Sequence, residues 1–287
     1  MYNLKDSPVK KIMYKFLSSN IGTKILHFVV KTGFEDFVFR LLYKDFLKNR
    51  QKYFFEHKND IDENIKLLED EKSKEVYRKM IEFKSTRKRK FFPDYSIDDQ
   101  YFTKEIIQIS PNEVFVDCGA FTGDTIINFK KYSNDAFKYA ICFEPDIENF
   151  TKLKEKLDKD TRIYFFQNAV DSECKEVLFK NGAGMESAIS KEGTSKIKAV
   201  NLDSIKECQD ATFIKMDIEG AELDALKGAQ NIIKNNKPKL AISIYHSESD
   251  MIQIIKYIHE LVPEYKLYVR QHNIFETDTI LYCIINK

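Results

Sequence analysis

From about residue 111 onward, the chain alternates between short apolar runs and amphipathic stretches. Seven apolar runs have the length of β-strands, and most are separated by segments with helical periodicity. This alternation predicts an α/β fold with a mostly parallel, doubly wound sheet. The expected strands are 114–117, 139–144, 163–169, 213–217, 240–245, 265–270 and 279–285.

Two segments modify this pattern. Residues 271–278 are too few for a crossover helix, so we expect the last two strands to form an antiparallel hairpin. Such an ending differs from the all-parallel sheet of dinucleotide-binding proteins. Residues 173–203 contain Gly182-Ala183-Gly184 and predict a glycine-rich, β-containing excursion from the sheet.

The N-terminal part of the chain has a different pattern. Long stretches with helical periodicity, 35–47 and 61–83, are dense in Lys and Glu, and strand patterns are nearly absent there. We therefore expect a helical N-terminal region over 1–95 and an α/β domain over 96–287. The basic run 84–90 marks the boundary, and we interpret it as a solvated linker in preference to a nucleic-acid contact.

Composition narrows the class of protein. A hydrophobic content of 43% in 287 residues is enough to bury a substantial core. The formal charge of +1, from 46 basic and 45 acidic side chains, gives no overall field that would attract nucleic acid, so no such partner is expected. The five cysteines are odd in number and lack Cys-x-x-Cys spacing, which indicates reduced thiols and a cytoplasmic protein.

Membrane association is expected at most at the surface. No apolar stretch approaches the length of a transmembrane helix, so neither membrane insertion nor secretion is expected. Lysines outnumber acidic residues up to residue 35, which would allow peripheral contact with anionic lipid. An amphipathic helix that packs on its own domain is the simpler alternative. The helical N-terminal region could also pair two subunits.

The first expected strand runs into a glycine-containing turn, Asp117-Cys118-Gly119-Ala120-Phe121-Thr122-Gly123-Asp124. A strand, such a turn and a following helix bring backbone N–H groups and a positive helix N-terminus to a ligand. Glu144 ends the next strand, where a carboxylate can bind a ribose diol. Together they indicate a nucleoside-containing cofactor.

The glycine spacing helps to choose that cofactor. Phe121 replaces the middle glycine that lets a pyrophosphate approach the backbone. Asp117 would repel a pyrophosphate but suits the cationic sulfonium and ammonium groups of S-adenosylmethionine. An NAD(P)-dependent oxidoreductase and a non-catalytic S-adenosylmethionine-binding protein remain alternatives.

Five polar residues follow five of the expected strands: Asp117, Glu144, Asn168, Asp217 and His246. In a parallel sheet they would all lie along its carboxyl edge, where ligands bind. Each one alone would be typical of a cap or a turn. Their recurrence at successive strand ends predicts a binding site at that edge.

Four of these five residues, all except His246, belong to distinctive sequence blocks. The most specific block is Lys215-Met216-Asp217-Ile218-Glu219-Gly220-Ala221-Glu222, and the others are 113–125, 143–146, 168–170, 201–203 and 226–229. With these blocks the chain resembles the FkbM-type S-adenosylmethionine-dependent methyltransferases over roughly residues 95–287. The resemblance implies a Rossmann-like class I methyltransferase fold and activity on hydroxyl groups of sugars or other small metabolites, here a bacterial sugar O-methyltransferase.

The resemblance also assigns residues to parts of the cofactor. It implies that Asp117, Gly119 and Gly123 lie near the methionine part and Glu144 near the ribose. The residues implied near the adenine are Asp146, Asn168 and Ala169. The other expected cofactor-binding residues are Ala120, Thr122, Asp124, Pro145 and Asp217, and Glu186, Ser187 and Ser190 are expected to cover the site.

Methyl transfer to a hydroxyl requires alignment of the acceptor and removal of its proton. The catalytic candidates are Asp217, Glu219 and His246, with His246 as the general base and His272 as a further contributor. The same three candidates would suit Mg²⁺ or Mn²⁺, which can lower the pKa of an alcohol. Alternatively, Glu219 caps the following helix and Asp217 only stabilises the turn. The expected acceptor is a sugar or glycan hydroxyl.

Overall fold

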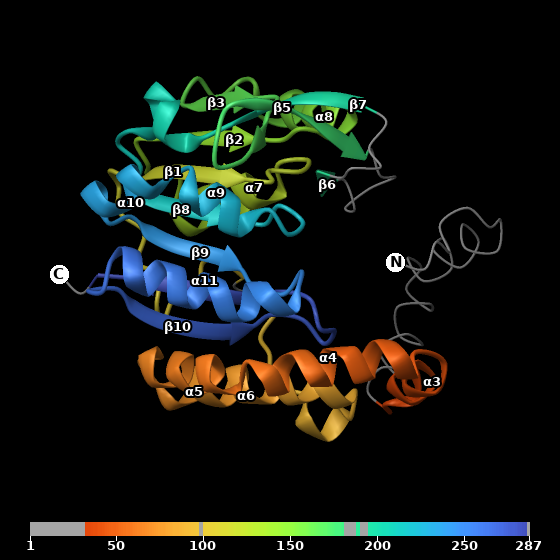
Figure 1. Cartoon of the computed structure of the whole chain (residues 1–287). Coiled ribbons are helices and arrows are strands. Elements are labelled where there is room, and N and C mark those ends of the chain that lie inside the picture. The colour runs from red at the N-terminus through yellow and green to blue at the C-terminus, as the bar shows by residue number, and fades with distance from the viewer. Residues whose placement is uncertain (1–31, 98–99, 181–187, 190–194, 286–287) are drawn as a thin grey trace.

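A seven-stranded sheet forms the centre of the molecule (Figure 1). The computed structural model describes residues 32–97, 100–180, 188–189 and 195–285. Its central strands are β1 Val114–Cys118, β2 Tyr139–Phe143, β3 Ile163–Phe166, β8 Phe213–Met216, β9 Lys239–Ser243, β10 Lys266–Gln271 and β11 Thr279–Ile284. They lie in the order β10-β11-β9-β8-β1-β2-β3, and β11 runs antiparallel to both of its neighbours. The predicted fold class and the terminal hairpin are confirmed.

The third expected strand, 163–169, is divided between two sheets. β3 ends at Phe166, and β4 Ala169–Val170 pairs instead with β7 Ser195–Val200. Asn168 stabilises this change, because its side-chain amide donates to the carbonyl of Lys198 at 3.1 Å. The second sheet has the order β4-β7-β5-β6, with β5 Lys175–Lys180 and β6 Ala188–Ile189, so the excursion does contain strands. Glu186, Ser187 and Ser190 lie outside the described residues.

Side-chain alternation in the central strands builds two hydrophobic layers. In β1, Val114 and Val116 pack with α9 Glu222–Lys227, α10 Gln230–Asn236 and α11 Glu248–Leu261, whereas Phe115 packs with α7 Asp124–Tyr132 and α8 Ile147–Leu157. Phe115 stacks on Phe129 with ring centroids 4.5 Å apart. Complete burial of each such side chain contributes about 1.5–3 kcal/mol. These layers fix the strand ends that carry the polar residues.

Four α-helices precede the sheet in the described chain: α3 Phe34–Leu42, α4 Lys44–Glu56, α5 Lys58–Leu67 and α6 Glu71–Thr86. Each of the two expected long helices is therefore broken. The second break follows from extended backbone at Leu68 and from Asp70, whose side chain accepts the Ser73 N–H at the start of α6. In this break, the Glu69 N–H donates to the carbonyl of Leu267 at 2.9 Å, which ties the segment to β10.

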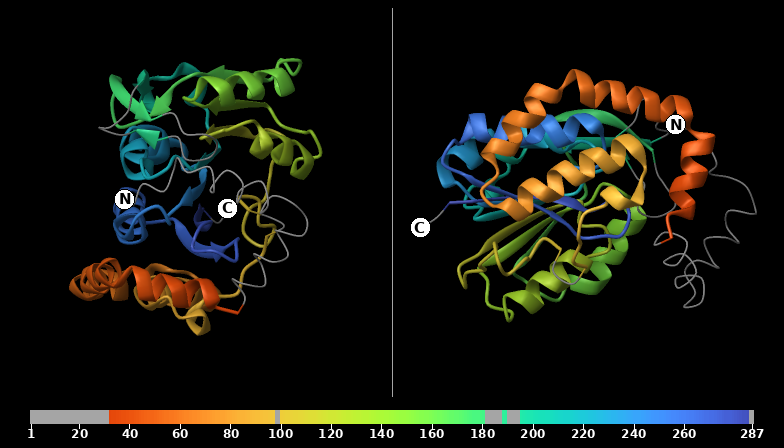
Figure 2. Two further views of the ribbon diagram at one scale, coloured as in Figure 1. Left: turned by 90° about the vertical axis from the view of Figure 1, so that its right-hand side faces the viewer. Right: turned by 90° about the horizontal axis from the view of Figure 1, so that it is seen from below.

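The N-terminal helices pack on the sheet rather than standing apart from it. Figures 1 and 2 show α4 and α6 side by side next to β10. Val76, Tyr77 and Met80 of α6 are buried in the same hydrophobic core as the sheet and α11. The Tyr77 hydroxyl also donates to the carbonyl of Met251 in α11 at 3.0 Å. The division of the chain at residue 95 stays a prediction, but the described helices share a core with the sheet.

The interpretation of 84–90 as a solvated linker is wrong for two of its residues. Lys84 is 2% exposed and Arg87 is 4% exposed, and both form ion pairs with Glu276. Arg87 ends α6 in a left-handed conformation, with φ 49°. Burial with an acidic partner replaces hydration at these positions, because a buried cation needs such compensation.

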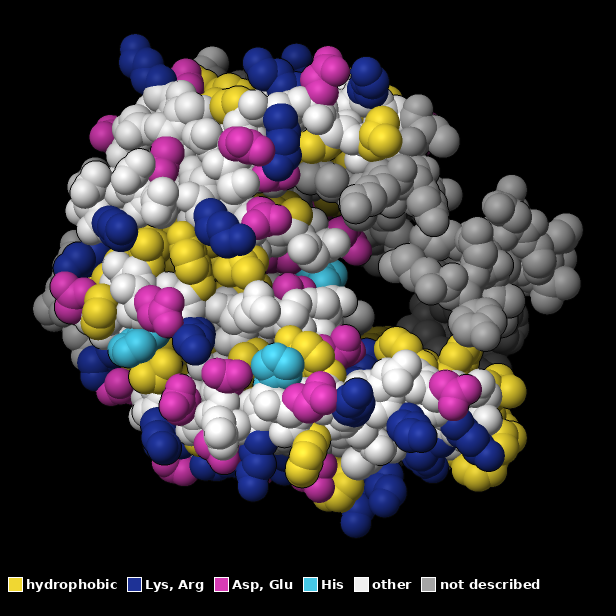
Figure 3. All heavy atoms as spheres, viewed as in Figure 1, with side chains coloured by type: hydrophobic (Ala, Val, Ile, Leu, Met, Phe, Trp, Pro, Cys, Tyr) yellow, Lys and Arg dark blue, Asp and Glu magenta, His cyan; other side chains and the backbone are white. Residues whose placement is uncertain are grey.

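Apolar side chains are exposed on the first two described helices. Figure 3 shows hydrophobic and basic side chains together at this end of the molecule. The most exposed apolar residues of α3 and α4 are Phe34, Phe37, Leu41, Leu42 and Phe55. No helix in the described part of the chain is long and apolar enough to cross a membrane. The lysine-rich segment expected to contact lipid lies almost wholly in residues 1–31, outside the described residues.

The shared core predicts that damage to α6 destabilises the whole chain. Met80 is fully buried, so Met80→Ala should lower the free energy of unfolding by about 2–5 kcal/mol. Denaturant unfolding followed by both far-UV circular dichroism and tyrosine fluorescence measures this change. Glu82→Ala, at an exposed position of the same helix, is the matched control and should change stability by less than about 0.5 kcal/mol. A separate early transition of the helices would contradict the shared core.

Candidate functional site

A cavity of about 620 Å³ opens at the carboxyl ends of β1, β2, β8 and β9. In Figure 3, acidic side chains and a histidine gather beside the hollow between the sheet and the N-terminal helices. The sheet edge thus brings together residues that lie more than a hundred positions apart in the chain. The predicted site residues in the cavity wall are Gly119, Asp124, Glu144, Pro145, Asn168, Ala169, Asp217, Glu219 and His246.

Four other predicted residues lie behind the wall and stabilise it. Ala120 is fully buried, and Gly123 is the N-cap of α7. Thr122 accepts hydrogen bonds from Lys156 through its carbonyl and its hydroxyl, both at 2.8 Å. Asp146 caps α8 by accepting the N–H groups of Glu148 and Asn149. These four residues are not among those that line the described cavity, and their contact with the cofactor stays a prediction.

Asp117 also lies outside the described cavity wall. It is fully buried and pairs with Lys215 through a 3.0 Å contact between Oδ1 and Nζ. Burial raises the pKa of Asp117 to about 6, while the ammonium group of Lys215 opposes this rise. The negative charge that the sequence suggested for a cationic cofactor is therefore compensated by a lysine of the chain itself.

Glycine is required at the end of β1 because the backbone of β8 approaches closely. A Cβ at Gly119 would lie 2.0 Å from the carbonyl oxygen of Asp217, and Gly119 has φ 82°. Phe121, which replaces the middle glycine, also has a positive φ of 48°. The turn therefore keeps a glycine-like backbone at a position where a side chain makes that conformation costly.

Glu144 presents a carboxylate to the cavity. Its Oε2 accepts the Phe121 N–H at 2.8 Å, and its Oε1 accepts the Asp146 N–H at 2.9 Å. Burial raises the pKa of Glu144 to about 7, although both N–H groups oppose this rise. The two backbone bonds fix the orientation of the carboxylate, which can accept further hydrogen bonds from a diol.

Asp217 lies at the centre of a polar network. It accepts hydrogen bonds from the hydroxyl groups of Tyr101, at 2.7 Å, and Tyr245, at 3.0 Å. Burial would raise the pKa of Asp217, but Lys215 and His246 outweigh it and hold the pKa below its usual value. Asp217 is therefore a carboxylate at neutral pH.

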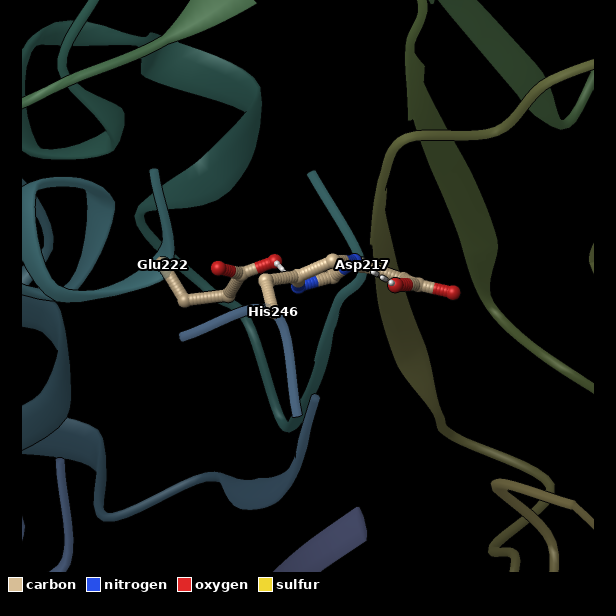
Figure 4. A group of neighbouring side chains, drawn as sticks. All are labelled: Asp217, Glu222 and His246. Atoms are coloured by element: carbon tan, nitrogen blue, oxygen red, sulfur yellow. Dashed lines mark ion pairs between the residues drawn. The ribbon is translucent and has the colours of Figure 1, made fainter. Parts of the chain in front are cut away.

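The imidazole of His246 lies between two carboxylates (Figure 4). Its Nδ1 is 3.1 Å from Oε1 of Glu222, and its Nε2 is 3.4 Å from Oδ1 of Asp217 and 4.0 Å from Oε2 of Glu219. Burial lowers the pKa of His246, but Glu222 and the other two acids outweigh it and raise the pKa to about 9. The ring is therefore an imidazolium at neutral pH.

Glu222, rather than Glu219, holds the turn before α9. Its oxygens accept the Ile218 N–H at 2.7 Å and the Gly220 N–H at 3.0 Å, and its side chain is fully buried. Glu219 has φ 59° and faces the cavity, and the N-cap position of α9 is Ala221. The alternative in which Glu219 caps the helix is therefore wrong.

His272 lies away from the cavity wall. Its Nδ1 is 2.7 Å from the carbonyl oxygen of Ser96, and its Nε2 is 2.8 Å from the hydroxyl of Tyr282. Both ring nitrogens are thus used in the packing of the terminal hairpin. Its suggested contribution to the site does not fit this position.

Several residues in or beside the cavity wall were not predicted as site residues. Tyr101 precedes the first strand, and Tyr245 is an ordinary apolar strand-end residue. Lys215 belongs to the most specific sequence block, but only the fold shows that it is buried beside Asp117. Glu222 is the last residue of the same block, and its place in that block was the sequence feature that could have indicated a role in the site.

The strand order, the antiparallel β11 and a ligand cavity at the carboxyl edge define a methyltransferase-type α/β protein. The chain belongs to the FkbM methyltransferase family, since the sequence model of the "Methyltransferase FkbM domain" matches residues 117–268.

A solved structure agrees with this assignment. Methyltransferase FkbM from Methylobacillus flagellatus KT is 28% identical, with a TM-score of 0.72 over 81% of this chain and 60% of that chain. This chain thus spans less than two thirds of that relative. An rRNA methylase from Streptococcus thermophilus is 14% identical, with a TM-score of 0.41 over 62% of this chain and 90% of the other, a likeness too low to carry any argument. No curated protein matches the chain.

Glu222 should control the charge of His246. Glu222→Gln removes the nearest carboxylate, so the pKa of His246 should fall from about 9 by about one unit or more. NMR titration of the imidazole resonances measures this change. Glu219→Gln, at the longer distance of 4.0 Å, is the matched control and should lower the pKa less. Equal decreases in the two variants would contradict the assigned pairing.

Proposed function

We propose that this protein is an S-adenosylmethionine-dependent O-methyltransferase that acts on a sugar or glycan hydroxyl. The observation that carries the proposal is that Glu144 and Asp217, at the ends of two separate strands, face one cavity in a member of a methyltransferase family. The family assignment also favours this activity over the NAD(P)-dependent alternative.

The described residues fit the proposed cofactor. The oriented carboxylate of Glu144 would accept hydrogen bonds from the ribose hydroxyls, and Gly119 leaves the adjacent wall without a side chain. Asp217 and Glu219 place negative charge beside the expected position of the sulfonium and ammonium groups. Asn168 and Ala169 line the part of the wall that the resemblance assigns to the adenine. When bound, the cofactor would supply an activated methyl group.

The chain's own residues would orient the acceptor and take its proton. Asp217 is ionised and held by Tyr101 and Tyr245, so we propose it as the acceptor of the proton, either directly or through a water molecule. His246 as the general base would first have to lose a proton, since its pKa is raised. A cationic cofactor bound nearby favours that loss, because like charges repel. Glu219 contributes negative charge at the cavity wall.

The side chains beside Asp217 are better suited to pairing with one another than to binding a divalent cation. Asp217, Glu222 and His246 lie close enough to ligate one ion. However, Glu222 already accepts two backbone N–H groups, and His246 would have to release the proton that its raised pKa retains. We therefore propose no role for Mg²⁺ or Mn²⁺ at Asp217, Glu219 and His246.

A cytoplasmic location and a small-molecule acceptor are part of the same proposal. All five cysteines are free thiols, and four of them are buried. This suits a reducing compartment. Exclusion of nucleic acid, pairing of subunits through the N-terminal helices and peripheral lipid contact stay predictions.

Binding and turnover test the proposed function directly. Calorimetric titration with S-adenosylmethionine and with NADPH should show binding of the first and not of the second. Mass spectrometry of nucleotide sugars and glycans incubated with the protein should then show the mass gain of one methyl group and formation of S-adenosylhomocysteine. The same reaction with EDTA present tests the metal. Binding without transfer to any acceptor would indicate a non-catalytic protein.

Asp217→Asn should remove the proton acceptor while preserving the shape of the side chain. We expect the turnover number to fall by about 100-fold or more, with a smaller loss of cofactor affinity. Initial rates of S-adenosylhomocysteine formation and calorimetry measure the two effects. Asp224→Asn, on the exposed face of α9, is the matched control and should retain activity. Unchanged turnover in Asp217→Asn would remove Asp217 from the mechanism.

A further inference from the structure

One end of the cavity, here called the second end, is formed by residues that lie outside the family match. Arg50 of α4 and Lys84 of α6 line it, together with the turn between β10 and β11, which contributes Asn273 and Glu276. The matched residues 117–268 instead form the end assigned to the cofactor. The two ends meet at Tyr245, whose hydroxyl donates to Asp217 and whose carbonyl accepts from Lys84 Nζ at 3.1 Å. The second end is therefore the place for the acceptor.

Two cations in this second end retain unused hydrogen-bond donors. Lys84 is 2% exposed, and its bond to Tyr245 is its single hydrogen bond to the described residues. Arg50 is 9% exposed and donates through Nε to Glu248 and through Nη1 to Glu276 and the Lys84 carbonyl, which leaves Nη2 without a described partner. The buried ammonium group of Lys84 in particular favours a ligand that can accept hydrogen bonds.

The charged groups around Glu276 indicate which kind of ligand this end of the cavity would bind. Its carboxylate lies 3.0 Å from Nη1 of Arg50, 3.1 Å from Nη1 of Arg87 and 3.9 Å from Nζ of Lys84. Burial lowers the pKa of Lys84, and the positive charges of Arg50 and Arg87 lower it further, although Glu276 and Glu248 oppose them. An anion in direct contact with Lys84 would stabilise its ammonium form, whereas a neutral hydroxyl would not.

We infer that the acceptor carries an anionic group, a phosphate or a carboxylate on a sugar, and that Lys84 and Arg50 bind it one tyrosine side chain away from Asp217. The inference rests on the proposed methyltransferase function. It assigns substrate selection to the N-terminal helices, which lie outside the family match. The guanidinium and the ammonium group act here as specificity determinants and take no part in methyl transfer.

Calorimetry on the protein loaded with S-adenosylhomocysteine tests this inference. The probes are glucose 1-phosphate, glucuronate and glucose, which share a ring and differ in charge. We expect one or both anions to bind about tenfold or more tightly than glucose, and their comparison identifies phosphate or carboxylate as the preferred group. Lys84→Met should abolish the preference for the anion without weakening glucose binding, and Lys84→Arg should retain it.

The controls separate this inference from the proposed function. Lys79→Met, on the same helix and half-exposed, should leave all affinities unchanged. Thermal unfolding and S-adenosylhomocysteine binding report whether each variant is folded and loaded. Equal binding of glucose and the anions, no binding of either anion, or unchanged anion binding in Lys84→Met would overturn the inference. If the unmodified protein does not bind S-adenosylhomocysteine, the proposed function is overturned instead.

Discussion

The buried ion pair between Asp117 and Lys215 is the interaction on which the site depends. The two residues are register partners on β1 and β8, and the Lys215 ammonium also donates to the Gly119 carbonyl at 2.8 Å. Removal of one partner from a buried pair leaves an uncompensated charge, which typically costs about 3–5 kcal/mol. The pair therefore holds the two strand ends together, and Gly119 is the residue that lets them approach so closely.

The charge distribution of the cavity follows from this arrangement. Because Lys215 neutralises Asp117, the negative charge at the cofactor end comes from other acids of the wall, among them Glu144, Asp217 and Glu219. His246 and its buried partner Glu222 then add an ion pair behind Asp217. A site of this kind offers negative charge to a cationic methyl donor and still keeps every deeply buried acid close to a compensating group.

The N-terminal helices link stability to selectivity. One face of α6 contributes Tyr77 and Met80 to the core of the sheet, while its C-terminal end brings Lys84 to the cavity. The sheet edge therefore does not end in solvent at β10, and the same packing that covers it completes the cavity wall. Variation in these helices would change the acceptor end while leaving the strand ends that form the cofactor end in place.

Local sequence patterns are enough to predict the central strands, the terminal hairpin and the polar strand-end residues that face the cavity, because these depend on periodicity and on the position of polar residues after apolar runs. Asp217 and His246 were found in this way, as was Glu144. Side-chain pairing was decided by the tertiary structure: the ion pair that removes Asp117 from the wall, the role of Glu222 and the burial of Lys84 all involve residues distant in sequence or hidden by the fold. The sequence around a charged residue is the same whether its side chain faces water, a ligand or an opposite charge. Only the packing of the whole chain therefore decides which of these environments the side chain has.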